Sequence, residues 1–195
     1  MLLSINTIRK TIGVGLIFLL IPNFAISQQF NLSSHESTMS LFGTSSLHDW
    51  HITTTNYNGN ILLNDITTCD IKACDISITS ESLKSGKKSM DKNTYKALKT
   101  DAHKTINFKL TSVDKVTSKG NGKLLVNAKG NLTITGVKKA ISIDFIADTS
   151  LSNTISLTGE KTIKMTDFNI DPPKALLGTI TTGDEITIKF KSIFK

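Results

Sequence analysis

The sequence predicts an all-β protein in which one curved antiparallel sheet closes around an apolar interior. Between Gly122 and Phe145, apolar and polar residues alternate on both sides of a glycine-containing turn, which is the pattern of a β-hairpin with one buried face. Similar alternation recurs along most of the chain, and only one short stretch has convincing helical periodicity. A closed sheet of this kind either packs solid with side chains or holds an apolar ligand.

The N-terminus has the pattern of a secretory signal peptide, which we assign to residues 1–27. Arg9 and Lys10 precede an apolar run from Ile12 to Ile21, and Ala25-Ile26-Ser27 supplies the small residues of a cleavage site. The run is shorter than the roughly 20 residues of a membrane-spanning helix, although an uncleaved N-terminal anchor is the alternative. We therefore expect one folded domain, residues 28–195, in the periplasm or secreted from the cell.

The basic charge of the chain comes almost wholly from lysine. The formal net charge is +7, and Arg9 is the single arginine. Because bidentate recognition of bases and phosphates uses the guanidinium group, we expect no nucleic-acid partner. A solvated lysine surface is the simpler interpretation, and transient contact with anionic membrane headgroups is the alternative.

Cys69 and Cys74 are the two cysteines of the chain. In one continuous strand they would lie roughly 16 Å apart and on opposite faces, whereas a disulfide needs Cα atoms within about 7 Å. A disulfide therefore requires a turn at residues 70–73. The sequence leaves open whether the two cysteines are free or form a disulfide. A zinc site is less favoured, because further ligands are missing nearby.

Taken in order, the remaining elements follow from period-two alternation, helical periodicity and turn residues. The helix spans Met90 to Lys99, with Met90, Thr94, Ala97 and Leu98 on one face and Ser89 or Asp91 as the cap. Pro172-Pro173 predicts a loop from Asp167 to Gly178. The expected strands lie near residues 37–42, 50–57, 60–66, 71–79, 105–113, 122–135, 140–149, 154–165 and 185–194.

The sequence contains none of the common catalytic motifs, so we predict no catalytic residues, no metal site and no cofactor. The nearest approach to a site is His48-Asp49-Trp50-His51. On a strand, His48 and His51 would face opposite sides. We interpret this segment as a hydrogen-bonded histidine beside a buried tryptophan; the enzymatic alternative is an exported hydrolase using His48, Asp49 and a serine such as Ser46.

Several landmarks follow the export signal in a characteristic order and cover essentially the whole chain after it. The landmarks are Gly43-Thr44-Ser45-Ser46-Leu47-His48-Asp49-Trp50, Ser82-Leu83-Lys84-Ser85-Gly86, Met90-Asp91-Lys92-Asn93, Ile106-Asn107-Phe108, Gly130-Asn131-Leu132-Thr133-Ile134-Thr135-Gly136-Val137-Lys138-Lys139, Met165-Thr166-Asp167-Phe168-Asn169-Ile170 and Gly183-Asp184-Glu185-Ile186. Together they resemble the YceI family of exported, lipocalin-like polyisoprenoid-binding proteins.

The resemblance implies an eight-stranded antiparallel lipocalin-like barrel with one short helix and an elongated apolar pore that holds a long isoprenoid chain. The chain departs from better-known members, which typically carry an arginine near the segment from Met165 to Phe168. Tyr95 and Leu98 on the helix, with Phe168 and Leu176 in the loops, are the candidate gate residues. The candidate ligand-binding residues are Trp50, Ile52, Ile78, Tyr95, Leu98, Ile106, Phe108, Leu132, Ile134, Ile143, Phe145, Met165 and Phe168.

The sequence is consistent with two functions of different classes. The first is an exported binding protein, monomer or homodimer, that holds an isoprenoid or other long-chain lipid for carriage, storage or protection of the cell envelope under stress. The alternative is a filled β-barrel that acts as a structural or interaction protein without a lipid ligand. The volume of the apolar interior distinguishes the two.

Overall fold

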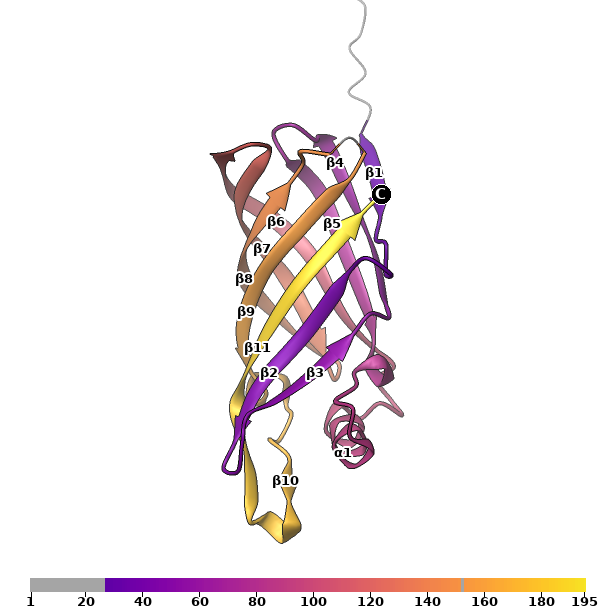
Figure 1. Ribbon diagram of the computed structural model, residues 1–195, viewed down its shortest axis with the longest axis vertical. Helices are drawn as coiled ribbons and strands as arrows, with labels where there is room; N and C mark the ends of the chain where they lie inside the picture. The colour runs from indigo at the N-terminus through magenta and orange to yellow at the C-terminus, as the bar shows by residue number, and fades with distance from the viewer. Residues whose placement is uncertain (1–26, 152) are drawn as a thin grey trace, which may run out of the picture.

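The computed structural model describes residues 27–151 and 153–195, and it is an all-β protein with one α-helix (Figure 1). The predicted signal peptide lies outside the described residues except for Ser27. The helical elements are η1 Ser80–Ser82, α1 Lys88–Leu98, η2 Thr166–Phe168 and η3 Leu176–Gly178. The strands are β1 Gln28–Asn31, β2 Thr38–Ser45, β3 Trp50–Thr54, β4 Tyr57–Asp65, β5 Asp70–Thr79, β6 Thr105–Gly120, β7 Lys123–Ile134, β8 Val137–Asp148, β9 Ile155–Lys164, β10 Lys174–Ala175 and β11 Ile180–Phe194.

The strands form one curled antiparallel sheet in the order β1-β4-β5-β6-β7-β8-β9-β11-β2-β3, with β10 paired to β11 (Figure 1). The ten strands on this path correct the expected count of eight. Short β1 and β10 were not predicted, and β6 continues well past the expected end at residue 113. The predicted loop from Asp167 to Gly178 is irregular only from residue 169 to residue 173, because it also includes the end of η2, the two-residue β10 and η3.

The count differs because two positions in the sheet are each occupied by two short strands instead of one long strand. β1 and β2 follow one another along β11, where Asn31 exchanges two backbone hydrogen bonds with Lys195 and Thr38 is opposite Lys191. β3 and β4 follow one another on the other side, pairing with β2 and β1 respectively. The ten strands therefore occupy eight positions around the sheet, and β1 is hydrogen-bonded back to the end of β11.

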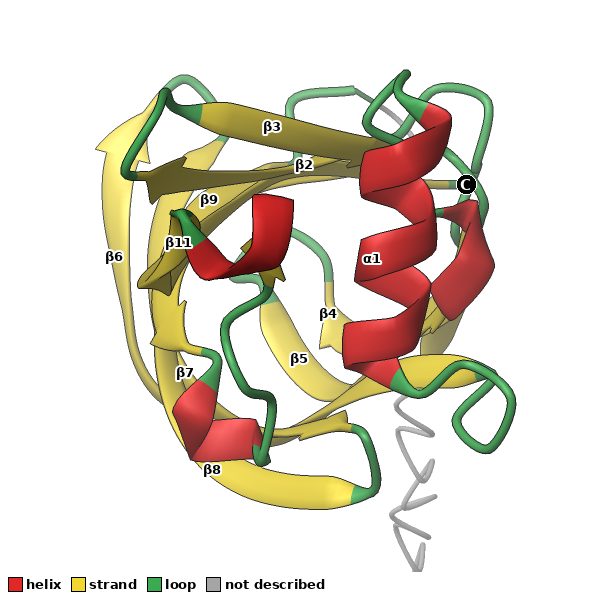
Figure 2. Ribbon diagram, turned by 90° about the horizontal axis from the view of Figure 1, so that it is seen from below, coloured by secondary structure: helices red, strands yellow, loops and turns green. Residues whose placement is uncertain are grey.

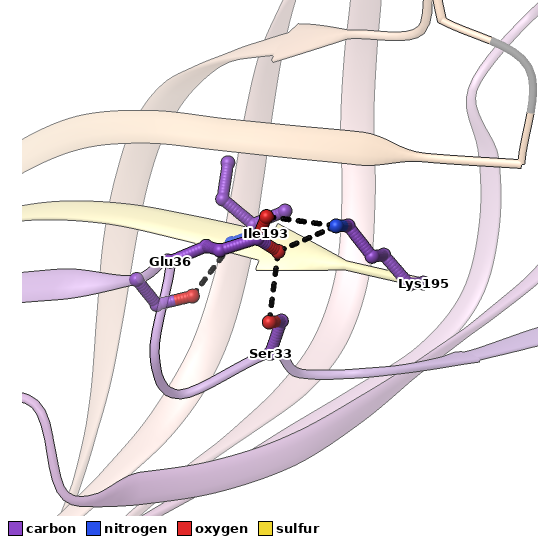
Figure 3. A network of polar contacts seen from close by, with 5 residues as sticks. Ser33, Glu36, Ile193 and Lys195 are labelled. Carbon is purple, nitrogen blue, oxygen red and sulfur yellow. Dashed lines mark hydrogen bonds and ion pairs between the residues drawn. The ribbon is translucent and has the colours of Figure 1, made fainter.

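A small polar network fills the interruption between β1 and β2 (Figure 3). The Ser33 hydroxyl donates to Glu36 at 2.9 Å, and the Lys195 ammonium lies 2.7 Å from the same carboxylate. These hydrogen bonds hold the pKa of Glu36 below its usual range. The pair is exposed and therefore contributes little to stability. The buried hydroxyl of Ser37 accepts a hydrogen bond from the amide of Ile193 at 2.8 Å. This bond and the backbone hydrogen bonds between Asn31 and Lys195 join the segment between β1 and β2 to β11.

The predicted hairpin at the centre of the sequence is present, and its turn has the expected chemistry. β7 and β8 pair residue by residue from Lys123 opposite Asp148 to Ile134 opposite Val137. Thr135 and Gly136 make the two-residue turn, and both have positive φ angles of 49° and 78°. This geometry matches the right-handed twist of the flanking strands, which is why a glycine occupies the second position.

The apolar interior consists of two packed clusters at opposite ends of the curled sheet. The upper cluster lies at the end where the C-terminus meets β1 (Figure 1) and includes the fully buried Ile61, Leu63, Ile155 and Phe194. The lower cluster lies toward α1 and η2. Its buried residues include Ile52, Leu83, Met165 and Phe168. Between the two clusters the inward-facing side chains are only half-buried.

The cysteines are free thiols, so the structure does not contain the disulfide left open by the sequence. The turn that a disulfide requires lies before Asp70 rather than between the cysteines, and Cys74 is within β5. Both side chains are buried in the upper cluster. Burial, helped by the neighbouring aspartates, raises the pKa of Cys69 to about 11 and that of Cys74 to about 12.

Both thiols should therefore react slowly with a thiol reagent in the folded protein at pH 8. The thiolate is the nucleophile, and a raised pKa together with burial leaves very little of it accessible. Labelling with a maleimide, followed by intact mass, should show complete modification in denaturant and little under native conditions. Rapid native labelling of both cysteines would contradict the packing of the upper cluster.

Candidate functional site

The interior of the curled sheet contains a cavity of about 390 Å³ that extends from the upper cluster to the lower one. Its wall is built from alternate residues of the strands, and α1 supplies part of the lower end. Leu41, Ile143 and Ile188 face this space and are only half-buried, although Leu41 also packs against the lower cluster and Ile143 against the upper one. The interior is therefore not filled solid along its length.

The structure brings the sequence-predicted residues to this wall, with one exception. Tyr95 does not line the cavity. That any of these residues contacts a ligand stays a prediction. The predicted residues on the wall are Trp50, Ile52, Ile78, Leu98, Ile106, Phe108, Leu132, Ile134, Ile143, Phe145, Met165 and Phe168.

Tyr95 instead anchors α1 to the segment after η1. Its hydroxyl donates to the carbonyl of Glu81 at 2.9 Å and receives a hydrogen bond from Lys84. The Lys84 ammonium also lies 4.9 Å from the centre of the Tyr95 ring, a cation–π distance. Helical periodicity could not reveal this role, because the partners lie outside the helix.

Helix α1 crosses one side of the lower end of the sheet (Figure 2). The predicted inner face is present: Met90, Thr94, Ala97 and Leu98 line the cavity. None of the helix residues is fully buried. The expected cap is wrong, since the helix begins after Lys87 without a side-chain cap and Asp91 accepts from the Ser85 amide instead. The helix is thus held by its half-buried inner face against the lower cluster and by the polar contacts of Asp91 and Tyr95.

The sequence reasoning missed the glycines that keep the wall open. A Cβ on Gly43 would lie 2.2 Å from the Trp50 ring, and one on Gly130 would lie 2.3 Å from the Phe108 ring. In each case an aromatic ring from the neighbouring strand lies flat over an inward-facing glycine. The ring stays against the wall instead of projecting into the space. The sequence shows each glycine at an inward position of its strand, but only the strand register shows which aromatic ring lies over it.

Polar groups gather at the lower rim of the cavity. His48, Lys87, Asn93, Lys174 and Thr182 line this end. The side chain of Leu176, a predicted gate residue, lies outside what the structure describes. The cavity thus has an apolar wall and a polar rim.

The contacts around His48 hold the turn between β2 and β3. A ring nitrogen of His48 lies 2.8 Å from the backbone carbonyl of Asp49, and the Trp50 indole N–H donates to the Thr44 carbonyl at 2.9 Å. The Ser46 hydroxyl accepts from the Thr181 amide at 3.1 Å. None of these contacts links serine, histidine and carboxylate side chains, as the hydrolase alternative requires. Within the described residues, no group of three histidine, cysteine or acidic side chains could hold a metal ion.

The fold and the cavity define a class of protein: a curled antiparallel sheet enclosing one elongated apolar cavity. The chain belongs to the family of YceI-like domains, whose family model matches residues 30–194. This confirms the resemblance drawn from the sequence. No helix among the described residues is long and apolar enough to span a membrane. Among curated proteins, no sequence matches this chain.

Solved structures with low sequence identity share the fold. BcnA of Burkholderia cenocepacia is 16% identical, with a TM-score of 0.69, and the match covers 83% of this chain and 98% of that one. A polyisoprenoid-binding domain from Saccharophagus degradans, implicated in plant cell wall breakdown, is 12% identical, with a TM-score of 0.67 and coverage of 85% and 97%. A YceI protein of Campylobacter jejuni is 20% identical, with a TM-score of 0.56 and coverage of 71% and 80%.

Proposed function

We propose that this protein binds a long apolar lipid, a polyisoprenoid or a molecule like an isoprenoid quinone, inside a lipocalin-like barrel. The observation that carries the proposal is the predominantly apolar wall of the cavity that extends between the two packed clusters. Its volume of about 390 Å³ lies within the range of small-molecule sites in proteins. A barrel of eight positions is just wide enough to hold one slender ligand.

Burial of hydrocarbon alone is a sufficient driving force for such a ligand. Each buried methylene contributes about 0.8 kcal/mol, so an isoprenoid tail binds without polar contacts along its length. The half-buried wall residues, among them Leu41 and Ile188, would exchange contact with water for contact with the tail. The Saccharophagus domain of similar fold, described as polyisoprenoid-binding, supports this ligand class.

The proposed setting is outside the cytoplasm, in the periplasm or the secreted fraction, after cleavage near Ser27. There the protein would carry, store or protect its lipid without chemistry of its own. Lysines on the outer surface favour brief contact with anionic headgroups during loading or release. Residues of a single chain line the cavity, and the proposal covers a monomer or a homodimer.

Native mass spectrometry of the protein purified from an exporting bacterial host tests the proposal. We expect a stoichiometric hydrophobic adduct of several hundred daltons, which organic solvent extracts for identification. The contrary result is a clean apo mass that does not shift with added isoprenoid quinones. That result would favour the structural or interaction protein instead.

A further inference from the structure

Lys161 is a lysine that faces the cavity from β9. It lies between Gly159 and Ile163 on the inward-facing side of the strand, opposite Ile188 of β11, and it lines the cavity wall. Along β9 it is midway between Leu157 of the upper cluster and Met165 of the lower one. A cationic side chain thus interrupts an otherwise apolar strip of wall.

The exposure of Lys161 sets it apart from the other lysines. Every other lysine in residues 27–151 and 153–195 is exposed, whereas Lys161 is half-buried. Lysine is almost never withdrawn from water unless its charge is paired, because desolvation of an ammonium group is costly. An inward lysine therefore needs an explanation that a solvated surface lysine does not.

No anion of the protein compensates this charge. The side chain of Lys161 has no ion pair or hydrogen bond with any described residue, and no aspartate or glutamate lines the cavity. The other charged wall residues, Lys87 and Lys174, are also cationic and lie at the lower rim. The three charged side chains on the described cavity wall are therefore all cationic.

Lys161 also lies where the pairing of β9 with β8 has ended. Pairing between β8 and β9 runs from Asp148 opposite Ser156 to Asp144 opposite Glu160 and ends there. Lys161 is thus the first residue of β9 beyond the region paired with β8, while it stays paired with Ile188 of β11 on the other side.

We propose that the ligand is amphipathic and that Lys161 binds its anionic head group, a carboxylate or a phosphate, while the hydrocarbon tail occupies the apolar wall. The inference rests on the proposed function, because it assumes that the cavity holds a lipid. An anion at this position supplies the missing partner in a partly desolvated site, where a charge-assisted hydrogen bond is stronger than in water.

Binding of matched lipids to wild-type protein and to variants tests this assignment. The ligands are hexadecanoate and hexadecanol, which share a tail, and geranylgeranyl phosphate and geranylgeraniol, which share another. The single tryptophan, Trp50, lies on the cavity wall and reports binding by its fluorescence. The variants are Lys161→Met and Lys161→Arg, with Lys164→Met on the outward side of the same strand as the matched control.

We expect wild-type protein to bind at least one anionic lipid about tenfold more tightly, or more, than its neutral partner. Lys161→Met should abolish that preference, measured as the ratio of the affinities for the two lipids of a matched pair, and Lys161→Arg and Lys164→Met should retain it. The anionic lipid that loses more affinity in Lys161→Met identifies the head group: hexadecanoate indicates a carboxylate, and geranylgeranyl phosphate indicates a phosphate. A preference that is absent from wild-type protein, or that survives Lys161→Met, overturns the assignment of the head group. Failure of all four lipids to bind overturns the proposed function itself.

Discussion

Ile143→Trp should abolish lipid uptake while leaving the protein folded. Ile143 faces the middle of the cavity from β8 and is half-buried, so a larger ring there occupies space that the proposed tail needs. The cost to folding should stay within the 1–3 kcal/mol typical of an oversized residue, because the ring enters open space. Native mass spectrometry after expression should show only apo protein, and circular dichroism should show an unchanged β spectrum.

Ser142→Trp is the matched control for this change. Ser142 is the preceding residue of β8, exposed on the outer face opposite Lys129, and it does not line the cavity. This variant should carry the same lipid adduct as wild-type protein. Normal lipid content in a folded Ile143→Trp variant would place the ligand elsewhere and contradict the cavity as the binding site.

Phe194→Ala should destabilise the protein by about 3–5 kcal/mol, the range for removing a buried aromatic side chain. Phe194 is fully buried in the upper cluster, and its backbone bridges to Leu32 where the edge of the sheet returns to β11. The change leaves a hole at the point where the end of β1 meets the end of β11. Urea denaturation should show a lower midpoint with an unchanged slope.

Ile193→Ala provides the comparison, because Ile193 is the neighbouring residue with opposite orientation and is only half-buried. Its backbone amide, bonded to Ser37, is untouched by the substitution. We expect a clearly smaller loss of stability. Equal losses for the two variants, or a loss below about 1 kcal/mol for Phe194→Ala, would mean that the upper cluster does not depend on this ring.

Alternation along the chain predicted much of the fold because it is a local record of which face of a strand is buried. The hairpin of β7 and β8 and the inner face of α1 are where the pattern placed them. The same pattern placed nearly all of the predicted site residues on the cavity wall. Tyr95 was the exception, because its partners Glu81 and Lys84 lie outside the helix.

Features that depend on which strands are neighbours were not accessible in this way. The interruption between β1 and β2 is held by Ser37 and the distant Ile193, so the count of eight strands failed there. The Phe108 ring occupies the space over Gly130, and only the pairing of β6 with β7 brings these two residues together. Lys161 was included in a general lysine surface, although its parity with Ile163 already placed it on the inner face.

By itself, the sequence determined the all-β class, the single short helix, the family and the apolar character of the inner face, because each is encoded by residues close together in the chain. Only the tertiary structure decided that the interior holds a cavity, that Lys161 stands in its wall without a partner among the described residues, and that both thiols are free. Those outcomes depend on register and closure, which are set by contacts between segments far apart in the chain. A pattern of alternation says which way a side chain points, whereas the opposing strands decide what it meets.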